Sequence, residues 1–247
     1  MKMLSLFDGI GGFPLAGSFF GIESVAASEV EPFCIRVTQE RFPNMKHLGS
    51  VTDINGAEAE PVDIITFGSP CQDLSVAGKQ LGIHDGERSN LFFEAVRIIK
   101  EMREHDRVVN GRTGIDARPR FAVWENVPGA FSSNKGEDFK SVLEALCSVC
   151  DEAVSIPRPE GGGGWSPAGC VVGKGYSIAW RVLDAQYYGV PQRRKRIYLI
   201  ADFGSERAGE IQFVGESMPW NSPQSREARE SAARYVERSP DGSSEHG

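Results

Sequence analysis

The first 200 residues alternate short apolar runs with longer stretches whose apolar positions recur at helical spacing. This alternation is typical of βαβ units, in which helices connect parallel strands. It therefore predicts an α/β protein with a mostly parallel sheet. The predicted strands are residues 3–7, 24–28, 63–67, 121–124, 177–183 and 196–201, and the predicted helices are residues 31–42, 90–104 and 138–150.

Three segments depart from this pattern. Residues 106–119 are polar and rich in arginine, which predicts an exposed loop between a helix and a strand. Residues 157–169 hold four consecutive glycines and three prolines, which predicts a flexible surface insertion. Beyond residue 204 the alternation fades into polar sequence. We therefore expect one folded domain over residues 1–204 and a polar tail over residues 205–247.

The overall charge limits the kind of partner. The chain has 27 basic and 34 acidic residues, a formal net charge of −7, so any contact with nucleic acid must be local. No apolar run approaches the roughly 20 residues that cross a bilayer, and the sequence MKMLSLFDGIGG does not resemble a secretory signal. Five cysteines at irregular spacing favour reduced thiols. We expect a cytoplasmic protein without a membrane partner.

A glycine turn follows the first predicted strand. In SLFDGIGGF, Gly9 and Gly11 match the start of the dinucleotide motif G-x-G-x-x-G, but Pro14 replaces its third glycine. The next strand ends at Glu29, where an acid in such folds binds ribose hydroxyls. The pattern favours a nucleoside ligand without a pyrophosphate, such as S-adenosylmethionine. The alternative is a tight turn with an exposed acid.

A cysteine follows the strand at residues 63–67, in the sequence Gly68-Ser69-Pro70-Cys71-Gln72. Ligands of parallel α/β sheets gather at this edge. A lone cysteine is usually a small buried apolar residue. The preceding proline and the following polar, glycine-containing residues favour a nucleophile beside a segment that can move as a lid.

Five motifs occur in a characteristic order: SLFDGIGGF, the strand ending in Glu29, GSPCQDLS, Glu125-Asn126-Val127 and QRRKR at residues 192–196. Together they resemble the DNA cytosine-5 methyltransferases, especially those of bacterial and phage modification systems, over residues 3–203. The resemblance implies a Rossmann-like, doubly wound α/β domain of the S-adenosylmethionine-dependent methyltransferase type. It also implies S-adenosylmethionine as cofactor, double-stranded DNA as substrate and methylation of cytosine at C5.

The resemblance assigns catalytic roles. Cys71 would attack C6 of a flipped cytosine, and Glu125 would protonate N3 and accept a hydrogen bond from the exocyclic amine. Asn126 would brace the cysteine loop. Arg196 would lie near the base and the thiol, and Arg194 would bind the loop or the DNA backbone. The alternative for Glu125 is a solvated acid at a strand end, and the alternative for the arginines is a solvated basic surface.

The resemblance also implies a cofactor site, with Phe7 against the adenine and Glu29 on the ribose. Where the family usually has an Asp on the adenine amine this chain has Ser50, with Asp53 three residues further on, and both stay open as that contact. The other matching positions are Gly9, Ile10, Gly11 and Gly12 around the methionine part, together with Val30, Pro70 and Leu91.

The target base must leave the duplex, so DNA is expected across the carboxyl edge of the sheet. Five arginines in and around residues 106–119 are candidate phosphate contacts: Arg103, Arg107, Arg112, Arg118 and Arg120. Acidic residues lie among them, which favours a solvated loop over phosphate contact. Cys147 and Cys150 form a C-x-x-C pair without a second pair or a histidine cluster, so no metal site is expected.

Members of the family normally continue into a target-recognition region and two further motifs, which residues 204–247 are too short and polar to supply. This leaves three hypotheses. The chain is a DNA cytosine-5 methyltransferase, active either alone or with a complementing chain that supplies recognition; it is a non-catalytic or split-enzyme remnant that binds cofactor or DNA; or it is a tRNA cytosine-5 methyltransferase. The last is disfavoured by the residues that follow the Pro-Cys pair, Gln72-Asp73-Leu74-Ser75.

Overall fold

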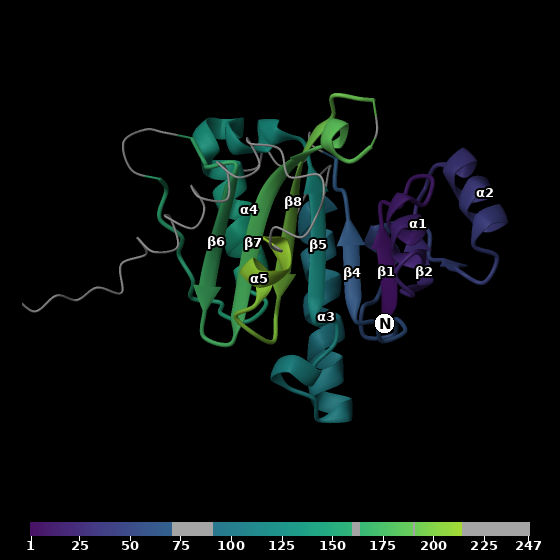
Figure 1. The fold of residues 1–247 in the computed structure, drawn as a ribbon. Coiled ribbons are helices and arrows are strands. Elements are labelled where there is room, and N and C mark those ends of the chain that lie inside the picture. The colour runs from purple at the N-terminus through teal and green to yellow at the C-terminus, as the bar shows by residue number, and fades with distance from the viewer. Residues whose placement is uncertain (71–90, 160–163, 190, 214–247) are drawn as a thin grey trace, which may run out of the picture.

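The computed structural model describes residues 1–70, 91–159, 164–189 and 191–213. These residues form one mixed β-sheet with helices packed on it (Figure 1). No helix among them has the length and apolar character needed to cross a membrane. The described parts of the predicted strands and helices are present, with small shifts at their ends.

The sheet has eight strands in the order β3-β2-β1-β4-β5-β8-β7-β6. The strands from β3 to β5 pair in parallel, whereas β8 lies antiparallel between β5 and β7. Their bounds are β1 (Lys2–Leu6), β2 (Glu23–Ser28), β3 (Lys46–His47), β4 (Ile64–Phe67), β5 (Phe121–Asn126), β6 (Ala168–Gly173), β7 (Tyr176–Asp184) and β8 (Lys195–Asp202).

The order of the parallel strands contains a topological switch. From β1 the chain continues to β2 and β3 on one side and then returns to β4 and β5 on the other. Ligands in such sheets bind outside the carboxyl ends of the strands at the switch. The glycine turn after β1 and the Gly68–Pro70 segment after β4 therefore emerge next to each other.

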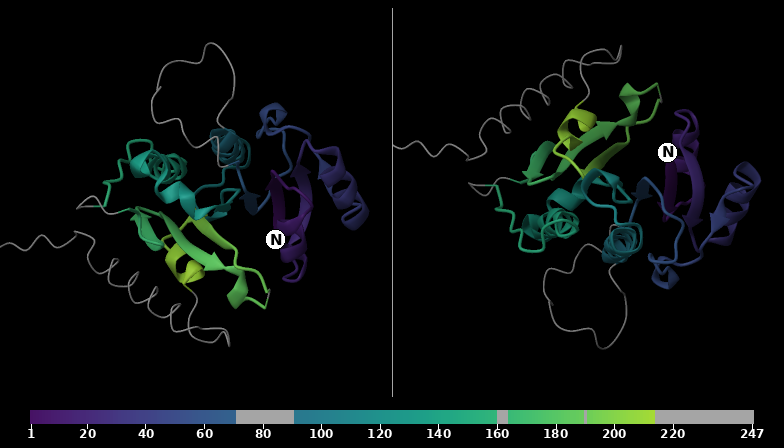
Figure 2. Two further views of the ribbon diagram at one scale, coloured as in Figure 1. Left: turned by 90° about the horizontal axis from the view of Figure 1, so that it is seen from above. Right: turned by 90° about the horizontal axis from the view of Figure 1, so that it is seen from below.

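The helices are α1 (Gly12–Ser18), α2 (Pro32–Arg41), α3 (Leu91–Asn110), α4 (Glu137–Cys147) and α5 (Ala208–Gln212). Figure 2 shows α3 and α4 on one face of the sheet and α5 on the other. Helix α3 is longer than predicted and takes in the first residues of the predicted loop. Its buried face, which includes Phe92, Ala95, Ile98 and Ile99, packs in the main hydrophobic core.

Aromatic side chains join α4 to the antiparallel strands. The Phe139 ring contacts Trp165 and Trp180 edge to face, with centroids 5.2 and 5.4 Å away. The Trp165 indole N–H donates to the Gly136 carbonyl at 2.8 Å. The segment predicted as a flexible insertion is thus anchored at its C-terminal side, where β6 begins. Its glycines 161–163 lie outside the described residues.

Two further segments depart from the sequence prediction. The folded domain continues past residue 204 through α5, where the Ala208 backbone N–H donates to Ser177 Oγ at 2.9 Å. In the predicted arginine-rich loop, the Asp106 carboxylate is buried and accepts from Arg118 N at 2.9 Å and from Asn110 Nδ2 at 2.7 Å. This loop is therefore an ordered, hydrogen-bonded connection. Residues 214–247 of the predicted tail lie outside the described residues.

Candidate active site

The segment that leads to the cysteine is held by the end of β5. The Trp124 indole N–H donates to Ser69 Oγ, and the Asn126 amide Nδ2 donates to the Ser69 carbonyl, both at 3.2 Å. Ser69 and Asn126 are buried. Two side chains of one strand thus hold the backbone two residues before Cys71, which itself lies outside the described residues. The bracing role expected for Asn126 concerns the cysteine loop from residue 71 onward and stays a prediction.

Glu125 projects from the same strand end toward the first residues of β8. Its Oε1 lies 2.9 Å from Arg196 Nε and 4.0 Å from an Arg194 guanidinium nitrogen. The antiparallel register places Glu125 opposite Tyr198 and Asn126 opposite Ile197. The residues just before Ile197, which include Arg196, therefore lie beside the end of β5, where Glu125 can reach them. The two arginines of the QRRKR run therefore converge on the predicted catalytic acid.

Gly68 lets the Glu125 carboxylate approach the cysteine segment. A Cβ atom at position 68 would lie 3.3 Å from Glu125 Oε2, which is tighter than an ordinary contact. The carboxylate therefore lies between the Gly68–Pro70 segment on one side and Arg196 on the other. Sequence reasoning missed this role, for which the signal was a glycine directly after a buried strand.

The glycine turn after β1 is tied to the end of β2 by Glu29. Glu29 Oε2 accepts from the Gly9 N–H at 2.7 Å, and Oε1 accepts from the N–H groups of Val30 and Glu31 at 2.8 and 2.9 Å. Gly9 has a φ of 57°, a left-handed conformation that favours glycine. A Cβ atom at Gly9 or Gly12 would meet nothing within 4 Å, so the turn borders open space.

Asp8 lies inside this turn and was not singled out from the sequence. Its side chain is 7% exposed, and neither carboxylate oxygen has a hydrogen-bond partner among the described residues. Burial raises the pKa of Asp8 to about 6, and the charge of Glu29 adds to the rise against an opposing effect of Ser5. A buried carboxylate without a partner is suited to a cationic ligand.

The remaining candidate cofactor residues surround the same edge. Ser50 caps the short 3-10 helix Val51–Asp53, and its hydroxyl oxygen lies 2.7 Å from Thr52 Oγ1, which donates to Asp53 Oδ1 at 3.2 Å. The Ser28 hydroxyl donates to the Gly49 carbonyl at 2.6 Å and thereby joins this segment to β2. Of the other predicted contacts, Phe7 and Leu91 are half-buried against the core, whereas Ile10, Val30 and Pro70 are exposed.

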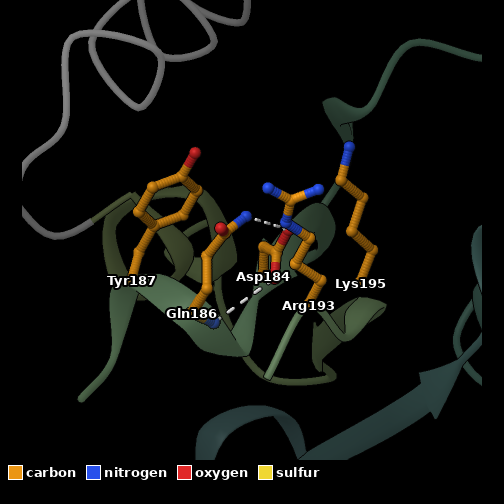
Figure 3. Close-up of a pocket in the computed structure, with 5 residues that line it drawn as sticks. All are labelled: Asp184, Gln186, Tyr187, Arg193 and Lys195. Carbon is orange, nitrogen blue, oxygen red and sulfur yellow. Dashed lines mark hydrogen bonds between the residues drawn. The ribbon is translucent and has the colours of Figure 1, made fainter. Parts of the chain in front are cut away.

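A basic pocket of about 530 Å³ lies in the connection between β7 and β8 (Figure 3). Asp184 shapes it by accepting from Gln186 Nε2 at 2.7 Å and from the Arg194 backbone N–H at 3.1 Å. Figure 3 shows the side chains of Tyr187, Arg193 and Lys195 projecting to one side. Since β8 starts beside the end of β5, the pocket flanks Glu125 at the carboxyl edge.

The arginines considered as phosphate contacts lie elsewhere, because residues 111–120 precede β5 at the opposite edge of the sheet. Arg103 donates to the carbonyls of Ala117, Pro119 and Phe203. Arg118 pairs with Asp63 at 3.1 Å. These side chains hold the connection together, as Arg120 does by its pair with Asp202. The described residues contain no cluster of three or more histidine, cysteine or acidic side chains that could hold a metal.

Known proteins share both the fold and the sequence pattern. The DNA N-6-adenine-methyltransferase of Escherichia phage P1 is 31% identical over 217 residues, covering 80% of this chain and 28% of that protein. The type II methyltransferase M2.BsuMI of Bacillus subtilis (strain 168) is 33% identical over 201 residues, covering 81% of this chain and 42% of that protein.

Among solved structures, a putative DNA modification methyltransferase encoded in an E. coli prophage matches with a TM-score of 0.54 and 20% identity, covering 82% of this chain and 47% of that one. This supports the predicted Rossmann-like methyltransferase fold. The chain spans half or less of the length of each curated relative named here.

The family described as C-5 cytosine-specific DNA methylase matches residues 1–149 and 172–239, which is most of the sequence. The matched residues include the glycine turn, the Pro-Cys segment, Glu125 and the arginines that contact it. The chain therefore belongs to the C-5 cytosine-specific DNA methylase family.

Proposed function

We propose that this chain carries the catalytic part of an enzyme that transfers a methyl group from S-adenosylmethionine to C5 of cytosine in double-stranded DNA. The observation that carries the proposal is the position of Glu125, between the segment leading to Cys71 and the guanidinium of Arg196. An acid and a cation beside the segment that leads to a cysteine suit the addition of a thiolate to a cytosine ring.

The residues around the glycine turn fit the cofactor of this family. The turn borders open space, and Asp8 offers a buried carboxylate without a partner, which suits a ligand with cationic groups. Phe7, Gly9, Ile10, Gly11, Gly12 and Glu29 would hold the cofactor, with Val30, Pro70 and Leu91 at its sides and Ser50 or Asp53 at the adenine. When bound, S-adenosylmethionine supplies the electrophilic methyl group.

In the proposed reaction the target cytosine is flipped out of the duplex. The Cys71 thiolate forms a bond to C6 while protonated Glu125 gives its proton to N3, and the electrons of the C5–C6 double bond make C5 nucleophilic. Arg196 stabilises the Glu125 carboxylate left by this transfer, and the carboxylate keeps accepting from the exocyclic amine. After methylation, the C5 proton is lost to solvent and the thiolate departs, which restores the C5–C6 double bond and Cys71. The N3 proton returns to the Glu125 carboxylate, which leaves neutral 5-methylcytosine and protonated Glu125.

The DNA backbone would lie against the basic pocket between β7 and β8. Arg193 and Lys195 form no ion pair among the described residues, unlike Arg194 and Arg196. In a chain with a net charge of −7, two unpaired cations beside the catalytic acid provide local attraction for phosphates. We further propose that a region outside the described residues or a complementing chain reads the target sequence. The enzyme would act on DNA in the cytoplasm of a bacterial or phage-infected cell.

The test is to incubate the full chain with S-adenosylmethionine and duplex DNA of mixed sequence, digest the DNA and identify the methylated nucleosides by mass spectrometry. The proposal predicts 5-methylcytosine and its loss in Glu125→Gln. N6-methyladenine alone would contradict it, as would methylation of a parallel tRNA sample with none of DNA. A matched control is Glu104→Gln, whose acid lies exposed on α3.

A further inference from the structure

One face of the central strands is apolar and only half-buried. On β5, Trp124 is buried, whereas Val123 beside it is half-buried. On β8, Leu199 is buried, whereas its neighbours Tyr198 and Ile200 are half-buried. The buried residues belong to the main core, on the side of the sheet that α3 and α4 cover. We call the half-buried apolar side chains the open face: Ile64, Val123, Tyr198 and Ile200.

Helices α1 and α5 lie on the same side of the sheet as the open face. A Cβ atom on Gly17 of α1 would lie 3.2 Å from Met3 Cε, and one on Gly209 of α5 would lie 3.6 Å from Cys170 Sγ. Strand register places Met3 and Cys170 on this side, because residues that pair across strands share a face. Helix α1 packs mainly on β1 and β2, and α5 on β7 and β8. The open face therefore lies between the two helices, on strands of a kind that normally have both faces covered.

Charged side chains border the open face at both ends. The alternation along β5 and β8 places Glu125 and Arg196 at its carboxyl end, where they pair at 2.9 Å. At its other end Asp202 is buried and pairs with Arg120 at 3.1 Å. An apolar patch of this kind marks a contact surface. Its cover needs apolar side chains toward the sheet and polar side chains on its outer side.

The chain continues from α5 on this side of the sheet. Residues 214–247 lie outside the described residues, and the family match includes them up to residue 239. Their sequence predicts a helix over residues 223–239, because Ser222 suits the N-cap, Pro223 suits the first helical position and Pro240 ends the pattern. A helix of this length spans about 25 Å, close to the roughly 26 Å of the eight-residue strand β8.

The predicted helix has one stripe of small and apolar side chains. At about 100° per residue, the stripe takes up less than a third of the circumference. Its members are Ser225, Ala228, Ala232, Tyr235, Val236 and Ser239. The opposite side is charged and carries Arg226, Glu227, Glu230, Arg234, Glu237 and Arg238. Small side chains let a helix lie close to a sheet, and Tyr235 and Val236 add apolar area at the two margins of the stripe.

We propose that residues 223–239 form a helix whose small, apolar stripe covers the open face. Continuity supports this segment over a second copy of the chain, since it follows α5 on the same side of the sheet. Residues 214–222, when extended, span up to about 30 Å, which is enough to pass from α5 to the neighbouring strands. The inference does not depend on the proposed function, because it concerns how the domain packs.

The first experiment is photo-crosslinking of the full chain with Tyr235→p-benzoylphenylalanine, followed by digestion and mass spectrometry. This side chain keeps an aromatic ring and reacts under ultraviolet light with C–H bonds that it contacts. The expected product joins residue 235 to a peptide of β4, β5 or β8 and runs as one chain on a denaturing gel. Arg234→p-benzoylphenylalanine, on the charged side of the helix, is the control and should give little of this product.

The other results of the crosslinking each overturn the inference. Crosslinks only between two chains would assign the open face to a second copy. An absence of crosslinks would leave the face to a different protein. Crosslinks to α3 or α4 would place the segment on the wrong side of the sheet.

Hydrogen exchange gives the second readout. In the wild type, the amides of residues 226–238 should exchange at least about tenfold more slowly than those of residues 241–247. Ala232→Glu, in the centre of the stripe, should remove this protection, because burial of a carboxylate without a partner is costly. Ala233→Glu makes the same change about 100° further round the helix and should keep the protection. Fast exchange in the wild type, or equal exchange in the two variants, would overturn the inference.

Discussion

Glu125 and Arg196 form an ion pair across neighbouring antiparallel strands, with Oε1 and Nε 2.9 Å apart. Both side chains are about four-fifths buried, at 23% and 21% exposure. Water therefore screens this pair less than a surface pair, and removal of either side chain would leave the other charge largely buried without its partner. The pair links the β5 end, which holds the cysteine segment, to the start of β8.

Arg196→Met should slow covalent adduct formation on DNA about 100-fold, the size expected when one group that stabilises a developing charge is lost. The variant removes the cation that lies 2.9 Å from Glu125 and would stabilise the carboxylate left when the proton moves to N3. Single-turnover rates measure the effect. Arg36→Met, at an exposed position of α2, is the control and should leave the rate unchanged. An equal loss in both variants would contradict the role assigned to Arg196.

Gly68→Ala should lower the adduct rate with little loss of stability. The added Cβ would lie 3.3 Å from Glu125 Oε2, so the carboxylate must shift by a few tenths of an ångström. The matched control is Gly129→Ala, where the Cβ would meet Val127 Cγ2 at an ordinary 3.9 Å. If the two variants have equal rates and equal melting temperatures, the approach of Glu125 to the cysteine segment does not matter for the chemistry.

Asp8→Asn should stabilise the cofactor-free protein at pH 8 but not at pH 4. The pKa of Asp8 is raised from 3.8 to about 6, so the folded state holds its proton more tightly than the unfolded state. The stability that this provides is fully present below pH 3.8 and is lost as the pH rises through about 6. At about 1.4 kcal/mol for each tenfold change in proton affinity, the loss is at most about 3 kcal/mol.

Urea unfolding of the wild type and Asp8→Asn at the two pH values measures this difference. Without cofactor the variant should be the more stable protein at pH 8. Excess S-adenosylhomocysteine should reverse this order of stability, because it should stabilise the wild type more than the variant. A variant less stable than the wild type at pH 8 without cofactor would show that the Asp8 carboxylate has a partner in the folded protein.

Arg193→Ala and Lys195→Ala should weaken DNA binding and reduce its dependence on salt. Removing one phosphate-binding cation should lower the slope of log K against log salt by about 0.9. Lys174→Ala is the control of equal charge, because Lys174 lies in the turn between β6 and β7 at the other end of β7. Equal slopes for all three variants would exclude the β7–β8 pocket as a phosphate-binding surface.

The sequence predicted six of the eight strands and the three longest helices because their apolar periodicity is local, but it did not predict β3 and β6. Glu125 and the Pro-Cys segment were placed at strand ends by the same reasoning, and parallel pairing of β4 and β5 brings those ends together. The convergence of Arg194 and Arg196 on Glu125 depends on the register between β5 and β8. Strand register is a long-range property, so the sequence did not predict this pairing, and the family resemblance placed Arg196 only near the base and the thiol.

Other features could not be predicted from local patterns. Trp165 follows a run of glycines that indicates flexibility, yet its indole is buried against Phe139 because α4 and β7 leave an apolar space there. The sequence favoured a solvated loop over phosphate contact for the arginines around residues 106–119, but it did not predict the carbonyls and acids that Arg103, Arg118 and Arg120 contact. Asp8 was hidden within a glycine motif, and its importance depends on burial that the sequence does not reveal.

Covalent trapping shows whether Cys71 forms the adduct with cytosine that the proposed reaction requires. The full chain is incubated with S-adenosylmethionine and duplex DNA of mixed sequence that contains 5-fluorocytosine, then separated on a denaturing gel. Fluorine cannot leave C5 as a proton does, so the adduct should persist after methyl transfer. The expected result is a shifted band that depends on cofactor, disappears in Cys71→Ala and persists in Cys150→Ala. A shifted band that survives in Cys71→Ala, or no cofactor-dependent band with the wild type, would contradict it.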